Sequence, residues 1–184
     1  MVGVTGASGA PIAVRLVQAL SEAHVAFELV ISDAGRAVLR EECTLDADQL
    51  GRSASHTYSD SDLAAPIASG TVATAGMVVV PCSMNQVARI ATGLSDTLIA
   101  RAAHVHLKER RKLVLVPRET PLDAISLGHM TRLAELGAVI LVAAPPYYLH
   151  PKTVDDQTAY LAGKVLDQFG IGHSLYRPWG SRPA

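Results

Sequence analysis

The two residues best suited to chemistry stand side by side, as Arg118 and Glu119, directly after the apolar run Leu113–Val116 and Pro117. A guanidinium group can bind a phosphate through two parallel hydrogen bonds. A neighbouring carboxyl group that is partly buried can act as a general acid or base. An ion pair on a surface loop would explain the same two residues. Parallel sheets bind ligands at the carboxyl ends of their strands, however, and this favours a functional role.

A glycine-rich turn near the start of the chain has the residue types of a phosphate site. Residues 5–11 are Thr-Gly-Ala-Ser-Gly-Ala-Pro and connect an apolar run to a helical pattern. Glycine lets the backbone turn tightly, and the free N–H groups at a helix start attract anions. A plain strand-to-helix turn is an equally good explanation, because the turn lacks the G-x-G-x-x-G fingerprint of dinucleotide-binding proteins.

Pro81, Cys82 and Ser83 repeat this geometry at a second strand end, so a small anionic or hydroxylated ligand could lie between the two turns. Cys82 near a helix start could be an activated thiolate. No obvious base stands beside it, so a buried structural cysteine is the favoured interpretation.

Arg101 and Lys108 are seven residues apart, which places both side chains on one face of a helix. Two aligned cations can hold a phosphate. The same face runs into the basic segment 108–112, however, and the spacing alone favours a solvated surface.

The pair Tyr147 and Tyr148 follows another apolar run and could line a pocket for a π system, or simply pack within a loop. The seven histidines show no metal-ligand spacing, and the chain has no Cys-x-x-Cys pair. No metal is therefore expected.

Short apolar runs alternate with amphipathic stretches along the chain. Residues 43–62 are polar and are expected to form an irregular surface excursion, and Ser95 is expected to cap a helix. The expected strands are Val2–Thr5, Phe27–Ile31, Met77–Val80, Leu113–Val116 and Val139–Val142, and the expected helices are Pro11–His24, Asp33–Glu42, Ser83–Thr92, Asp96–Glu109, Leu122–Leu136 and Val154–Phe169. This alternation predicts an α/β fold with a doubly wound, mostly parallel sheet, a flavodoxin- or Rossmann-like three-layer sandwich.

Length and composition restrict the class of protein. A chain of 184 residues is expected to form one domain over residues 1–184. The net charge of −1 favours neither nucleic acid nor an anionic membrane as a partner. The start of the chain lacks the basic segment of a signal peptide, the apolar run Ala138–Ala144 is too short to cross a bilayer, and Cys43 and Cys82 show no paired spacing. We therefore expect a cytoplasmic protein.

Taken together, these segments resemble the UbiX family of flavin prenyltransferases, also described as phenylacrylic acid decarboxylase-like proteins. The similarity covers nearly the whole chain, and its most specific block joins a Lys-Glu-Arg-Arg motif to a Pro-Arg-Glu-Thr-Pro motif. The matching segments are residues 5–10, 67–70, 81–84, 96–103, 107–111, 116–121, 137–141 and 165–168.

The resemblance implies a flavodoxin- or Rossmann-like homo-oligomer, typically a dodecamer, with FMN held between subunits. The implied reaction transfers a dimethylallyl group from dimethylallyl phosphate or diphosphate to reduced FMN, first at N5 and then at C6, without a metal. The implied product, prenylated FMN, serves UbiD-type decarboxylases. The sequence does not distinguish the two donors.

The resemblance also assigns roles to residues of this chain. Glu42 would work with Ser8 in proton transfer, and Glu119 would protonate the departing phosphate. The residues expected to contact FMN are Gly6, Ala7, Ser8, Ser32, Ser83, Met84, Asn85, Gln86 and Arg118. Those expected around the prenyl phosphate are Arg101, Lys108, Glu119, Tyr148 and Lys164.

The chain departs from the family pattern at a few positions. Leu63 replaces an aromatic residue found in many members, and Asn85-Gln86 replace a common Lys-Thr pair. Three alternative functions remain open. A cysteine decarboxylase of related fold would carry a Pro-x-Met-Asn-x-x-Met-Trp stretch, which is absent here. A flavin-binding protein without catalysis would not need the cations and carboxylates. An NAD-dependent oxidoreductase could use Asp33 for a ribose, but the glycine fingerprint is missing.

Overall fold

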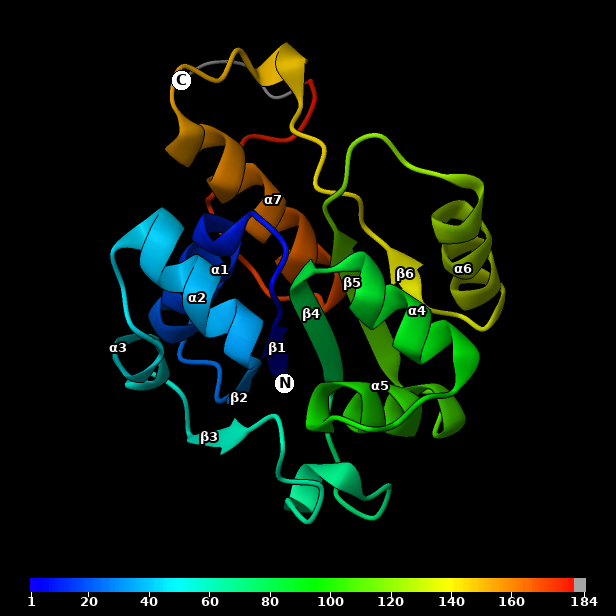
Figure 1. Ribbon diagram of the computed structural model, residues 1–184. Helices are drawn as coiled ribbons and strands as arrows, with labels where there is room; N and C mark the ends of the chain where they lie inside the picture. Colours follow the sequence, from blue (N-terminus) through cyan, green and yellow to red (C-terminus); the bar gives the residue numbers. More distant parts are fainter. Residues whose placement is uncertain (181–184) are drawn as a thin grey trace.

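The computed structural model describes residues 1–180 and contains a six-stranded sheet in which all paired strands are parallel (Figure 1). The strand order is β3-β2-β1-β4-β5-β6. The strands are β1 (Val2–Val4), β2 (Glu28–Ile31), β3 (His56–Ser59), β4 (Gly76–Cys82), β5 (Lys112–Pro117) and β6 (Val139–Ile140). The order reverses between β1 and β4, and such a reversal opens a crevice at the carboxyl ends of the two strands. The predicted α/β fold is confirmed.

Seven α-helices and two short 3-10 turns accompany the sheet in the described part of the chain. They are α1 (Ala10–Glu22), α2 (Asp33–Cys43), α3 (Ala47–Gly51), η1 (Pro66–Ala68), α4 (Met84–Thr92), α5 (Leu98–Lys108), α6 (Ala124–Glu135), η2 (Tyr147–Leu149) and α7 (Val154–Gln168). Within residues 1–180, no helix combines the length and apolar character needed to cross a membrane.

The expectation of an irregular segment over residues 43–62 was wrong. This segment contains α3, which Asp46 and Gln49 open with a reciprocal capping box, and the edge strand β3. The side chains of β3 are largely exposed, so main-chain pairing with β2 holds the strand in place. An edge strand of this kind leaves no apolar alternation in the sequence.

The expectation that Ser95 caps a helix was also wrong. Helix α5 begins two residues later than that cap requires, because the side chain of Thr97 accepts the first-turn N–H of Ala100. The hydroxyl of Ser95, which precedes the helix, is instead hydrogen-bonded to Nδ1 of His104 within α5.

Alternating residues of the central strands enter two separate apolar cores, because successive side chains of a strand point to opposite faces. Val78 and Val114 pack with α1, α2 and α7, whereas Val79 and Leu115 pack with α4, α5 and α6. The helices therefore cover the sheet in two layers (Figure 1). Helices α5 and α7 lie on opposite faces, which separates the side chains that they carry.

One buried hydroxyl joins the carboxyl ends of β1 and β4. Thr5 is 3% exposed, and its Oγ1 donates to Pro81 O at 2.7 Å while accepting from the N–H of Ser83 at 2.8 Å. The Thr5 N–H also donates to Pro81 O, at 3.3 Å. These bonds fix the start of α4 relative to the glycine turn after β1.

Replacing Thr5 by valine should test this connection, because valine keeps the shape and removes the hydroxyl. The N–H of Ser83 would then lose its partner in a partly buried place, which costs about 1–3 kcal/mol of folding free energy. Urea unfolding of Thr5→Val should show this loss. Thr5→Ser retains the hydroxyl and should lose less stability, and equal losses in the two variants would mean that the hydroxyl is unimportant.

Candidate active site

Four loops meet at the crevice where the strand order reverses. The N–H of Ser32, after β2, donates to Val4 O at the end of β1 at 3.0 Å. Arg118, after β5, reaches across and donates from Nε to Ser8 O at 3.2 Å. Together with the Thr5 contacts, these bonds bring residues from four strand ends into one site. The sequence predicted that the glycine turn, Pro81–Ser83 and Arg118 lie at this edge of the sheet, whereas Ser32 was expected only from the family resemblance.

Ser32 and Ser83 occupy equivalent positions on either side of the glycine turn. The side chain of Ser32 caps α2 by accepting from the Gly35 N–H at 3.1 Å, and Ser83 caps α4 by accepting from the Gln86 N–H at 3.3 Å. A hydroxyl that accepts a cap bond still has its O–H to donate. Both serines therefore present a donor, beside a helix start, to an anion in the crevice.

The start of α1 differs from the sequence expectation. Its first N–H groups are not free for phosphate, because Glu42 Oε2 accepts from the N–H of Gly9 at 2.8 Å and from that of Ala10 at 2.9 Å. Glu42, at the end of α2, thus caps α1. It lies 33 positions from Gly9 and 32 positions from Ala10 in the sequence. The phosphate donors of this site must come from elsewhere.

Glu42 is held in its ionised form. Partial burial pushes its pKa up, but hydrogen bonds from the Ser8 hydroxyl and from the Gly9 and Ala10 amides, with the nearby Arg118 charge, bring the pKa below its ordinary value. The Ser8 hydroxyl thus lies beside Glu42, and the expected role of the pair in proton transfer stays a prediction. An ionised carboxylate in this place can accept a proton from a ligand in the crevice.

Gly6 is required by close packing of α2 against the turn. A Cβ on Gly6 would collide with the Cβ of Ala34, and a Cβ on Gly35 would lie 2.7 Å from Val4 O. Glycine at both positions lets α2 approach the end of β1, and this approach sets the position of Ser32.

A buried amide points to a ligand at the start of α4. Gln86 is 4% exposed, and its Nε2 has no hydrogen-bond partner among the described residues. An unpaired buried N–H group costs free energy, so it indicates a missing acceptor. The ring carbonyls and nitrogens of a flavin supply such acceptors. Met84 and Asn85 complete the same helical turn, with Asn85 exposed.

Cys82 does not act as a thiolate. It is fully buried, and burial raises the pKa of its thiol far above the ordinary range. The expectation of a structural cysteine is confirmed.

The cations on α5 lie away from the crevice loops. Arg101 Nε donates to Ala68 O at 3.0 Å, and Lys108 Nζ pairs with Glu109 at 2.6 Å. The Lys108 side chain remains 56% exposed. Arg101 thus contacts the end of η1, and Lys108 lies near Gly70 just after it. Both side chains are exposed enough to meet a ligand or another molecule.

Tyr148 and Lys164 belong to the opposite face, with α7. The Tyr148 ring packs edge-on against Trp179, with centroids 4.9 Å apart, and Lys164 Nζ pairs with Asp167 at 3.0 Å. Because α5 and α7 cover different faces, one chain does not bring Arg101 and Lys108 to the same phosphate as Lys164. Glu119 is exposed, and its Oε1 accepts from the Thr120 N–H at 3.0 Å.

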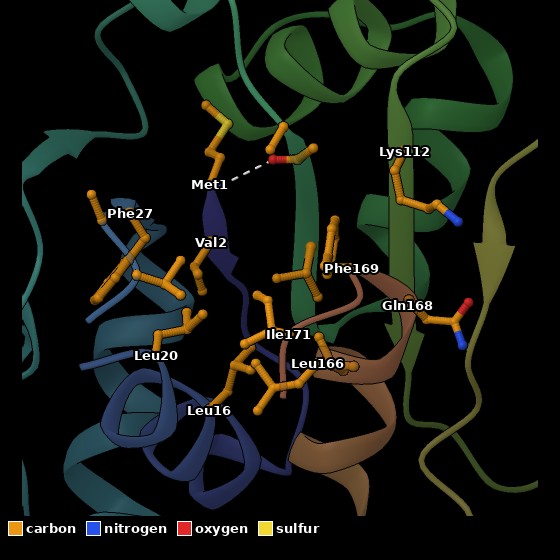
Figure 2. A pocket seen from close by; sticks show the side chains of 16 residues that line it. Met1, Val2, Leu16, Leu20, Phe27, Lys112, Leu166, Gln168, Phe169 and Ile171 are labelled. Atoms are coloured by element: carbon orange, nitrogen blue, oxygen red, sulfur yellow. Dashed lines mark hydrogen bonds between the residues drawn. The ribbon is translucent and has the colours of Figure 1, made fainter. Parts of the chain in front are cut away.

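An apolar cavity of about 330 Å³ lies at the opposite end of the central strands from the crevice, where these strands begin (Figure 2). It is lined by side chains of α1 and of the end of α7, and Lys112 supplies its only charged side chain among the described residues. The Met1 amine borders it and donates to Gly76 O at 3.0 Å. This cavity is at the amino ends of the strands and lacks the polar donors of the crevice, so it is not the candidate site. Within residues 1–180, no group of three or more His, Cys, Asp or Glu side chains could hold a metal ion.

The sequence does not indicate two of the residues that position the site, Thr5 and Asp60. For Thr5, a single Thr that ends an apolar strand is a possible signal. Asp60 accepts the first N–H groups of α5 through its own carbonyl and carboxylate, at 2.7 Å from Leu98 and 2.8 Å from Ile99. No local pattern connects residues so distant in the sequence.

The chain is similar to known flavoproteins over most of its length. A family model described as Flavoprotein matches residues 1–164. The flavin prenyltransferase UbiX of Thermoplasma acidophilum is 46% identical over 179 residues, which cover 97% of this chain and 98% of the relative. The chain belongs to the UbiX flavin prenyltransferase family. UbiX of Alkalihalophilus pseudofirmus is also 46% identical, over 97% of this chain and 94% of the relative.

Solved structures of the UbiX family share the fold throughout. AnUbiX (PadA1), in complex with FMN and dimethylallyl pyrophosphate, has a TM-score of 0.96 and 37% identity, covering 99% of this chain and 97% of that chain. A dodecameric FMN-dependent UbiX-like decarboxylase from Escherichia coli O157:H7 has a TM-score of 0.95 and 44% identity, covering 98% of both chains. The cysteine decarboxylase TvaF is only 13% identical at a TM-score of 0.65, so it shares the fold alone.

The contacts of Glu42 predict a pH-dependent contribution to stability. Because its pKa is lower in the folded protein than the ordinary value near 4.5, the ionised carboxylate stabilises the fold above that pH. The contribution is lost as the pH falls through the lowered pKa. Glu42→Gln should therefore unfold more easily than the wild type at neutral pH, and the difference in unfolding free energy should shrink in acid.

Urea unfolding over a pH series measures this difference. Glu41→Gln is the control, because Glu41 is an exposed neighbour on the same helix. A Glu42→Gln difference that stays constant from neutral to strongly acidic pH would contradict the proposed capping role.

Proposed function

We propose that this protein transfers a dimethylallyl group from dimethylallyl phosphate or diphosphate to reduced FMN. The observation that carries this proposal is the convergence of Arg118, two helix-capping serines and the unpaired Gln86 amide at the crevice between β1 and β4. The similarity to AnUbiX, which was solved with FMN and dimethylallyl pyrophosphate, supports both ligands.

The crevice fits FMN in charge and in hydrogen-bond donors. Arg118 and the hydroxyls of Ser32 and Ser83 suit the anionic phosphate, and Gln86 suits the ring system. Gly6, Ala7 and Ser8 line the same turn, with Met84 and Asn85 beside Gln86. Reduced FMN supplies the electron-rich N5 and C6 positions that accept the prenyl group.

The donor site requires residues from more than one copy of the chain. Arg101 and Lys108 on α5 cannot meet Tyr148 and Lys164 on the opposite face of the sheet within one protomer. A homo-oligomer would bring these two surfaces together, and the dodecameric relative from Escherichia coli supports such an assembly. The assembled cations would bind the phosphate of the donor, which is anionic both before and after its bond to the prenyl group breaks.

Two carboxylates would divide the proton transfers. Glu119 would donate a proton to the departing phosphate, which makes that group a weaker base and a better leaving group. Glu42, ionised and bonded to Ser8, would accept the proton that the flavin must lose when its second new bond forms. Glu119 would thus act where the bond to phosphate breaks, and Glu42 where the second bond to the flavin forms.

The product would be prenylated FMN, consumed by a UbiD-type decarboxylase in the cytoplasm. The two cysteines are both free thiols, which is compatible with a reducing compartment. A flavin-binding protein without catalysis is the alternative, and turnover separates the two.

Arg118 should be required for FMN binding. Its guanidinium charge is the main cation at the crevice loops, and losing a charge-assisted bond to phosphate should weaken FMN binding about 10- to 100-fold in Arg118→Ala. Fluorescence quenching of FMN measures the affinity. Arg15→Ala removes a cation that pairs with Glu22 on α1 and should bind FMN like the wild type. Equal FMN affinity in Arg118→Ala and the wild type would remove Arg118 from the site.

Glu119 should act in the chemical step. Glu119→Gln keeps the shape but has no proton to donate, so both ligands should still bind while prenylation slows about 10²–10⁴-fold. Tyr148→Phe should slow the same step more mildly. The assay is anaerobic single turnover with reduced FMN. Glu135→Gln, at the end of α6, is the control, and wild-type turnover by Glu119→Gln would exclude Glu119 as the acid.

A further inference from the structure

Asp167, near the end of α7, accepts hydrogen bonds from three side chains. Lys164 Nζ lies 3.0 Å from Oδ2, His173 Nε2 lies 3.0 Å from Oδ1, and the Tyr176 hydroxyl donates to Oδ2. Two of the three donors come from the segment after α7. Burial pushes the pKa of Asp167 up, but these bonds bring it below its ordinary value, so the group stays ionised.

The segment that carries these donors lies directly on α7 because Gly163 has no side chain. A Cβ on Gly163 would lie 2.8 Å from His173 Cε1 and 2.8 Å from the Tyr176 ring. The Leu175 N–H donates to His173 Nδ1 at 3.2 Å, so Nε2 is the nitrogen that donates to Asp167. The His173 ring is therefore packed against α7, with its Nε2 oriented toward Asp167.

Lys164 is held from two sides by this cluster. Asp167 accepts one of its N–H groups, and the Tyr176 ring lies 5.9 Å below the ammonium. The hydrogen bond to Asp167 is the main cause of a raised pKa at Lys164, so the ammonium stays charged. A free lysine side chain loses about 2 kcal/mol of rotamer entropy when it is ordered, and this cluster orders it in advance.

The same cluster continues to Tyr148. The Tyr160 and Tyr176 rings have centroids 4.9 Å apart, and burial together with the nearby Tyr148 hydroxyl raises the pKa of Tyr160. Lys164 and Tyr148 are the two residues of this face that the proposed function assigns to the donor. One continuous set of contacts thus fixes both.

We propose that Asp167 is a positioning residue for the prenyl donor, which acts by holding Lys164 toward the donor's phosphate. This inference rests on the proposed function. Asp167 does not touch the donor itself. Lys164 has three N–H groups, of which Asp167 uses one, so two remain for phosphate oxygens. The phosphate oxygens that Lys164 would contact are anionic in the bound donor as well as in the transition state, so the contact should contribute about equally to the binding of both.

The test is Asp167→Asn, in which the side chain keeps its size but loses its charge. The affinity of the FMN-loaded protein for dimethylallyl phosphate, measured by calorimetry, should fall about five- to twentyfold. KM should rise by the same factor while kcat changes little, since uniform binding is lost. Asp155→Asn, on the exposed first turn of α7, is the matched control and should match the wild type.

A double-mutant cycle distinguishes positioning from a general structural role. In a Lys164→Ala background, Asp167→Asn should cause no further loss of donor affinity, because Asp167 acts through Lys164. Tyr176→Phe should give a smaller loss of the same kind, and Asp167→Glu should recover part of it. FMN affinity and the unfolding temperature should stay near the wild-type values.

Wild-type donor affinity in Asp167→Asn would overturn the inference, as would an undiminished effect of Asp167→Asn in the Lys164→Ala background. The proposed function fails separately. If the wild type binds the donor without prenylating FMN, the prenyltransferase assignment is wrong, and the calorimetric comparison still tests Asp167. If the wild type does not bind the donor, both are wrong.

Discussion

The structure depends on the bond network of the Thr5 hydroxyl, which joins the two strand ends where the chain turns to opposite faces of the sheet. From β1 the chain passes to α1 on one face, and from β4 it passes to α4 on the other. The crevice between them stays open only if the two ends remain in register. Thr5 keeps that register through Pro81 and Ser83, and Gly6 and Gly35 let α2 close on the same point.

The two-faced sheet also determines how the donor site can be built. One face presents Arg101 and Lys108, and the other presents Lys164 and Tyr148 on a preordered cluster. Neither set alone contains all the residues that the proposed function assigns to the donor. Under that proposal, assembly of identical chains would bring the two sets together, and prenyl transfer would be a property of the oligomer.

The alternation of strands and helices, and the placement of the glycine turn, Pro81–Ser83 and Arg118 at strand ends, could be predicted because they follow from local patterns. Ser32, Gln86 and the place of Glu42 beside the site were expected only from the family resemblance. Apolar runs mark β1, β4 and β5, and polar residues directly after them mark the site. The strand β3 could not be predicted, since its exposed side chains carry no alternation. Glu42 as a cap of α1 and Asp167 as the acceptor for His173 and Tyr176 could not be predicted either. Each joins residues whose contact exists only after helices have packed.

The central claim is that the crevice binds reduced FMN for prenylation. Its most direct test is mass spectrometry of the flavin released after anaerobic incubation of the protein with reduced FMN and, separately, dimethylallyl phosphate or diphosphate. The account predicts a flavin heavier by one five-carbon prenyl unit with at least one of the two donors. Recovery of FMN at its original mass with both donors, from protein that demonstrably binds FMN, would contradict it.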